Sequence, residues 1–182
     1  MSFRNRLAWR AKLLRSAENT PFKPWLRDRG SLTASLQARG QFVVRVLRQG
    51  LAMPTRDEAI VLGIKRDQLA WVREVALLCD GEPLVFAHSV LPCRPRGAMT
   101  RWLARLGQRS LGALLFAHAG FARGAIHCKR LDHRHALFHP ALEAMCLAAS
   151  PPPHLWARRS HFAFGSQSVL VTEVFAPALI CA

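Results

Sequence analysis

Acidic residues are scarce in this chain of 182 residues, which contains 11 Asp and Glu against 26 Lys and Arg. The formal net charge is therefore +15. A positive field of this size favours an anionic partner, which is a nucleic acid, an acidic lipid or a small polyanion. The net charge by itself does not choose among these three partners.

Several functional patterns are absent. The five cysteines are odd in number and form no C-x-x-C pair, so neither a disulfide framework nor a zinc finger is supported and we expect reduced thiols. The sequence contains no G-x-x-x-x-G-K-[ST], G-x-G-x-x-G or G-x-S-x-G motif for phosphate, dinucleotide or acyl chemistry. His and Cys side chains gather between His127 and His154, but their spacing fits no compact zinc pattern. We therefore predict no metal.

Long apolar runs are also missing. No stretch of about 18 uncharged apolar residues occurs, so we expect no membrane-spanning helix. The N-terminus lacks the continuous apolar region of a secretory signal, which together with reduced thiols predicts a cytoplasmic protein. The arginines are scattered without a nucleic-acid-reading motif, so we expect no nucleic-acid partner.

The first 15 residues interleave apolar and basic side chains. At helical spacing, one face of this segment carries Phe3, Leu7, Ala11 and Leu14. The pattern predicts a basic amphipathic helix within an N-terminal extension, residues 1–20. This helix either docks by its apolar side or contacts a membrane surface. A hydrophobic content of 51% suffices for one core but not for two, so we expect residues 1–182 to form a single domain and a monomer.

The clearest structural signal is the Asp80-Gly81 dipeptide between two apolar runs, which is typical of a tight β-hairpin. A second hairpin is predicted around Gly165-Ser166. Hairpins and short helices without a βαβ rhythm predict an α+β fold, an antiparallel β-sheet with helices packed on it. We expect a further strand at 41–50 and another at 122–132, and helices at 31–40, from 110 and from 140. Residues 53–68 are expected to form a loop, with a short strand as the alternative.

Two charged side chains interrupt apolar strands. In "SVLVTEVFAPAL", strand alternation puts Glu173 on the same face as Val171 and Phe175, and Arg73 likewise shares a face with apolar residues. A charge in such surroundings requires a partner or a function. One interpretation is a sheet edge or a structural ion pair; the other is a dry pocket in which Arg73 binds a carboxylate bidentately. Glu74 and Glu82 are expected to be exposed or to form ion pairs at the surface.

Five segments taken together resemble the chorismate lyase family, which makes 4-hydroxybenzoate for ubiquinone synthesis. They are "GSLTASLQ", "WVREVALLCDGEPLVFAHSVLP", "SLGALLF", "WARRS" and "LVTEVFAPA", in that order, over roughly residues 25–179. The resemblance implies helical flaps that move over a buried site. It also implies that Arg73 and Glu173 are catalytic and that Leu32 and Leu111 join them in binding the substrate, chorismate.

In the implied reaction, chorismate loses its enolpyruvyl group as pyruvate and becomes aromatic. Arg73 holds the ring carboxylate and Glu173 binds the 4-hydroxyl; whether Glu173 also moves a proton is open. No cofactor and no metal is required, and a closed site predicts slow product release and product inhibition. The alternative is a non-catalytic small-carboxylate sensor or carrier of the same fold. Residues 133–154 form a longer segment than the family implies, and their role is open, as is transfer of the product to a membrane enzyme.

Overall fold

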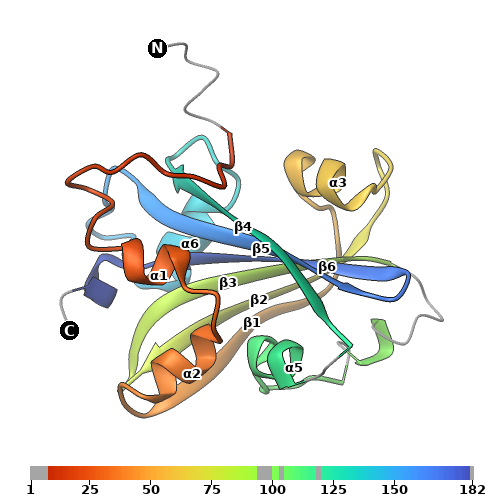
Figure 1. Ribbon diagram of the computed structural model, residues 1–182, viewed down its shortest axis with the longest axis horizontal. Coiled ribbons are helices and arrows are strands. Elements are labelled where there is room, and N and C mark those ends of the chain that lie inside the picture. The colour runs from red at the N-terminus through yellow and green to blue at the C-terminus, as the bar shows by residue number, and fades with distance from the viewer. Residues whose placement is uncertain (1–7, 94–99, 103–104, 118–119, 181–182) are drawn as a thin grey trace.

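The six strands of the protein form one antiparallel sheet (Figure 1). The computed structural model describes residues 8–93, 100–102, 105–117 and 120–180. The strand order is β1-β2-β3-β6-β5-β4. The strands are β1 (Phe42–Ala52), β2 (Ala70–Cys79), β3 (Glu82–Pro92), β4 (Ala122–Leu131), β5 (Leu155–Phe164) and β6 (Gln167–Phe175). This sheet, with helices packed on it, confirms the predicted α+β class.

The sheet consists of two three-stranded meanders. Strands β1, β2 and β3 are neighbours in chain order, as are β4, β5 and β6, and the pairing of β3 with β6 joins the two groups. Both predicted hairpin turns are confirmed: Asp80 and Gly81 have φ of 50° and 83°, and Gly165 has φ of 53°. These left-handed conformations are the ones that Asp and Gly tolerate in tight turns.

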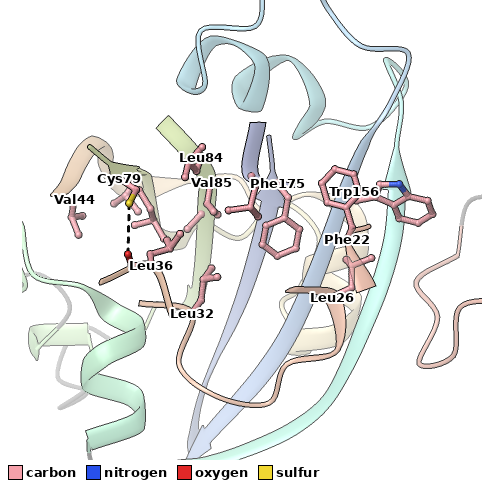
Figure 2. Close-up of a cluster of buried hydrophobic side chains, with 14 of the residues drawn as sticks. Phe22, Leu26, Leu32, Leu36, Val44, Cys79, Leu84, Val85, Trp156 and Phe175 are labelled. Atoms are coloured by element: carbon pink, nitrogen blue, oxygen red, sulfur yellow. Dashed lines mark hydrogen bonds between the residues drawn. The ribbon is translucent and has the colours of Figure 1, made fainter. Parts of the chain in front are cut away.

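Helices cover both faces of the sheet. The face that carries Arg73 and Glu173 packs against α1 (Lys23–Arg27), α2 (Leu32–Gln37) and α5 (Leu111–Ala117). The opposite face packs against α3 (Arg56–Leu62) and α6 (Phe138–Ala144). A 3-10 turn, η2 (Pro177–Ile180), follows the last strand. Leucines of α1 and α2 lie against strand residues in one apolar cluster (Figure 2).

The predicted helix after Ser31 is confirmed, and its start is explained by capping. The Ser31 hydroxyl accepts a hydrogen bond from the backbone N–H of Ala34 at 3.3 Å. This bond satisfies one of the free N–H groups at the helix start. The helix from residue 140 begins two residues earlier, at Phe138.

The loop predicted over 53–68 is wrong, because α3 lies within it. A capping box starts this helix: the backbone N–H of Thr55 donates to Glu58 Oε2 at 2.8 Å, and the Thr55 side chain accepts from the third helical residue. Gly63 ends it with φ of 63°. The T-x-x-E spacing is a recognised start signal for a helix, and it was present in the sequence.

The predicted N-terminal helix is also wrong over its described part, residues 8–15, which are not helical; residues 1–7 lie outside the described residues. Arg10 instead exchanges two backbone hydrogen bonds with Cys128 on the edge strand β4. The Trp9 indole N–H donates to Asp57 at 2.7 Å. These tertiary contacts outweigh the weak helical preference of a short segment.

Four cysteines in the described chain have free thiols, as expected, and Cys181 lies outside it. None of the helices described is long and apolar enough to cross a membrane.

Candidate functional site

Arg73 is a buried cation on β2, with 2% of its surface exposed. Its guanidinium donates to three neutral oxygens: Gln49 Oε1 at 2.5 Å and the backbone carbonyls of Gly107 at 2.9 Å and Arg109 at 3.1 Å. Burial lowers the pKa of Arg73. Among the described residues, no carboxylate pairs with it. A buried cation without a counter-ion is costly, and an anionic ligand would relieve that cost.

Glu173 on β6 has the partner that its apolar surroundings require. Its side chain is 15% exposed, and Arg158 Nε on β5 donates to its Oε2 at 2.5 Å. The two residues are direct cross-strand neighbours. Arg158 also donates to the backbone carbonyls of Trp25 and Asp28. Glu173 therefore forms an ion pair, whereas Arg73 has no acidic partner in the part of the chain described.

Strand register places Arg73 and Glu173 on the same face of the sheet. Arg73 is opposite Ser89, Ser89 is opposite Val171, and Glu173 is opposite Ala87. One strand, β3, therefore separates the two charged residues, which corresponds to about 10 Å across the sheet. The side chains of Ala87, Ser89 and Val171 on the surface between them are small. Arg73 and Glu173 thus lie on one face of the sheet, with short side chains of β3 between them.

The two leucines named from the sequence belong to the helices over this face. Leu32 in α2 is buried in the cluster that contains Ala87 and Phe175, and Figure 2 shows it there below Leu36 and Val85. Leu111 in α5 is buried in the neighbouring cluster with Val171. We call α2 and α5 the covering helices.

A side-chain hydrogen bond links α2 to the start of α5. The hydroxyls of Thr33 and Ser110 are 2.6 Å apart. Each covering helix is also tied to the sheet through the loop that precedes it, because Arg73 binds the carbonyls of Gly107 and Arg109 and Arg158 binds that of Asp28. The charged residues of the site thus fix the segments that enclose it.

Arg123 on β4 adds positive charge beside this face. Its Nε donates to Ser160 at 3.1 Å, and its Nη1 donates to the carbonyl of Arg29 at 2.8 Å. Burial and the neighbouring Arg158 lower the pKa of Arg123, while Glu173 opposes that shift. Arg123 and Arg158 both lie near Glu173, so this end of the face carries more positive than negative charge among these three residues.

The opposite face contains a different charged cluster. His88 Nδ1 lies 3.0 Å from Glu74 Oε1, and its Nε2 lies 3.3 Å from Glu58 Oε1. Glu74 is therefore paired, as one of the two predicted roles had it, but its partner is a buried histidine and its side chain is 15% exposed. Glu82 is exposed, as predicted. In the described chain, no three His, Cys, Asp or Glu side chains are grouped so as to hold a metal ion.

The sequence-based reasoning missed Arg158 as a site residue. "WARRS" contains two adjacent arginines whose side chains point to opposite faces of β5, Arg158 toward Glu173 and Arg159 toward Asp57. Their assignment depends on how β5 pairs with β6. Alternation within β5 alone separates the two arginines but does not say which faces the site.

The fold is one that the effector domains of transcriptional regulators share. The effector domain of PhnF from Mycobacterium smegmatis superposes with a TM-score of 0.53 at 16% identity, covering 82% of this chain and 90% of that chain. SA0254 from Staphylococcus aureus gives a TM-score of 0.56 at 12% identity, covering 84% and 91%. At these identities, the likeness describes the architecture alone.

Sequence comparison identifies the family: the chain belongs to the chorismate lyase family, whose model matches residues 4–181. It is 47% identical to a probable chorismate pyruvate-lyase from Dechloromonas aromatica, over 96% of this chain and 97% of that protein. A probable chorismate pyruvate-lyase from Azoarcus sp. is 44% identical, over 95% and 92%. The resemblance inferred from the five segments is confirmed.

Proposed function

We propose that this protein is a chorismate pyruvate-lyase that releases 4-hydroxybenzoate and pyruvate, the first committed step of ubiquinone synthesis. The observation that carries the proposal is Arg73, a buried cation that pairs with no carboxylate among the described residues and shares a sheet face with Glu173. Its guanidinium would bind the ring carboxylate of chorismate, in place of some of its present neutral partners. Family membership supplies the substrate class.

In this proposal, Glu173 accepts a hydrogen bond from the 4-hydroxyl, while Leu32 and Leu111 close the site from the covering helices. The bond between C3 and the enolpyruvyl oxygen breaks, C4 loses its hydrogen, and the ring becomes aromatic. The hydrogen passes to the departing enolpyruvyl group, either directly or through Glu173, so that pyruvate leaves. The atoms balance between one substrate and two products, so the step requires no external oxidant or reductant, and in this proposal no cofactor or metal takes part. The protein contributes orientation and exclusion of water.

The first experiment measures release of pyruvate and 4-hydroxybenzoate from chorismate by the purified protein in the presence of a chelator. We expect equal amounts of both products. Arg73→Ala should lower kcat/KM by roughly 100-fold or more, because it removes the only proposed partner of the ring carboxylate. Glu173→Gln should lower kcat. The matched controls are Arg48→Ala and Glu82→Gln, which alter exposed residues outside the site.

A non-catalytic carrier or sensor is the second candidate function, favoured by the fold that the chain shares with the effector domain of PhnF. The same experiment separates the two functions. Tight binding of 4-hydroxybenzoate without release of pyruvate would support a carrier or sensor and contradict the lyase.

We further propose that the protein acts as a cytoplasmic monomer that contacts acidic lipid through its basic N-terminal extension and binds no nucleic acid. The support for lipid contact comes from the surface around residues 13–27. Leu14 is 71% exposed, and a hollow of about 250 Å³ beside it is lined by Leu13, Arg15, Lys23 and Arg27, among others. These three cations pair with no acidic side chain in the described chain, so lipid phosphate is a suitable counter-ion.

A further inference from the structure

Arg158 connects Glu173 to the C-terminal end of α1, which leads into α2. Its Nε donates to Glu173 Oε2 at 2.5 Å, and its Nη1 donates to the backbone carbonyls of Trp25 at 2.5 Å and Asp28 at 2.8 Å. Its guanidinium carbon lies 5.8 Å from the centre of the Phe175 ring. With 1% of its surface exposed, Arg158 is among the largest fully buried side chains of the described residues. Three acceptors and this packing leave its guanidinium little freedom to move.

These contacts restrict Glu173 in a specific way. Arg158 holds Oε2, and within the described chain no side chain or backbone group hydrogen-bonds to Oε1. When one oxygen of a carboxylate is held, the orientation of the other oxygen is fixed as well. Glu173 lies on the same sheet face as Arg73. Oε1 is therefore the atom of Glu173 that can accept a hydrogen bond from a ligand.

We propose that Arg158 is a positioning residue for the reaction: it orients Glu173 toward the substrate hydroxyl and links that orientation to residues 25–28. This inference rests on the proposed function. When the segment before α2 is in place, its two carbonyls hold Arg158 and Arg158 holds Glu173. Closure of the site on the α2 side therefore also aligns Glu173, so the carboxylate is already oriented when the substrate reacts.

The next residue in the chain is a natural control. Arg159 also lies on β5 and also forms an ion pair, with Asp57 at 2.8 Å, but on the opposite face. Both arginines are buried in the same strand, Arg158 with 1% and Arg159 with 9% of its surface exposed. Loss of Arg159 therefore reports what removing a buried strand arginine does to stability, without any effect on Glu173.

The test is a double-mutant cycle of Arg158→Gln and Glu173→Gln, with Arg159→Gln as control. The readouts are kcat and KM for chorismate and Kd for 4-hydroxybenzoate, beside thermal unfolding. We expect Arg158→Gln to lower kcat by roughly 10- to 100-fold with a smaller change in KM, and the double variant to be no worse than Glu173→Gln alone. Arg158→Lys, which keeps the charge, should recover part of kcat. Arg159→Gln should lower the unfolding temperature and leave kcat within about twofold.

A double variant whose loss equals the product of the two single losses would overturn the inference, and so would a native kcat in Arg158→Gln. If the wild-type protein binds 4-hydroxybenzoate but releases no pyruvate, the lyase proposal fails, and the cycle in Kd still decides whether Arg158 acts through Glu173. If Arg158→Gln does not fold, the Arg158 Nε–H resonance of the wild-type protein replaces it. That resonance should shift when 4-hydroxybenzoate is added, and the shift should disappear in Glu173→Gln; an unchanged resonance contradicts the inference.

Discussion

At the scale of single residues, His88 is the group that links the fold most directly to pH. It lies on β3 between Glu58 and Glu74, next to the strand residue that pairs with Glu173. Burial alone would lower the pKa of His88, but the hydrogen bonds and charges of the two glutamates outweigh burial and raise the pKa to about 9. The imidazolium therefore holds α3, through Glu58, against the sheet.

This raised pKa gives stability a defined pH dependence. The unfolded histidine titrates near 6.5, so the imidazolium contributes its full stabilisation below that value and loses it as pH rises toward 9. We expect the free energy of unfolding to fall by about 3 kcal/mol across this window. Urea unfolding at several pH values measures this dependence. In His88→Gln, the free energy of unfolding should hardly change with pH in this window, whereas in the exposed control His133→Gln it should fall as in the wild type. A wild-type profile that does not fall in this window would contradict the assignment.

At the scale of elements, a hydrogen bond between two hydroxyl groups links α2 to the start of α5. The hydrogen bond between Thr33 in α2 and Ser110, the residue just before α5, links two segments that are far apart in the sequence. If the two helices must separate to release product, this bond opposes that motion. A neutral hydrogen bond of this kind contributes about 1 kcal/mol.

Thr33→Val should therefore accelerate release of 4-hydroxybenzoate by about fivefold and weaken product inhibition, because it removes the bond while keeping the side-chain shape. Stopped-flow measurement of product dissociation checks this result. Thr20→Val makes the same change at an exposed threonine outside the site and should leave release unchanged. An unaltered dissociation rate in Thr33→Val would mean that product leaves without breaking this contact.

The elements also show what the sequence could predict. The two hairpins and α2 were predicted because their signals, Asp80-Gly81, Gly165-Ser166 and the Ser31 cap, act within a few residues. The strand that holds Glu173, and the face on which that residue lies, followed from alternation. The Arg158 pairing could not be predicted, because it depends on the register between β5 and β6. The irregular path of residues 8–15 depends likewise on distant partners, Asp57 and Cys128.

At the scale of the whole molecule, the charge of +15 is concentrated in part near the N-terminal extension. The Trp9 indole donates a hydrogen bond to Asp57, and the Arg159 guanidinium carbon lies 4.4 Å from the centre of the Trp9 ring. The extension is therefore packed against the domain at Trp9. Deleting residues 1–16 would remove this contact together with the basic residues. Charge reversal is therefore the sharper test of membrane contact.

We expect Lys12→Glu with Arg15→Glu to abolish flotation of the full chain with vesicles that contain acidic lipid, since each basic residue near such a surface contributes about 1 kcal/mol. Neutral vesicles should not bind the wild-type protein. Arg48→Glu with Lys65→Glu changes the net charge by the same amount at exposed positions elsewhere and should still float. Equal loss in both double variants would indicate attraction by net charge without a defined lipid-binding surface.

The joining of two meanders through β3 and β6 has a consequence for assembly. Arg73 belongs to the first meander, whereas Arg158 and Glu173 belong to the second, so neither half of the chain contains a complete site. Each meander consists of strands that pair with neighbours in the chain, while the β3–β6 ladder joins segments about 80 residues apart. We therefore expect that if the chain is divided between β3 and β4, neither fragment is active alone. Activity on mixing the two fragments would show that the β3–β6 ladder has formed.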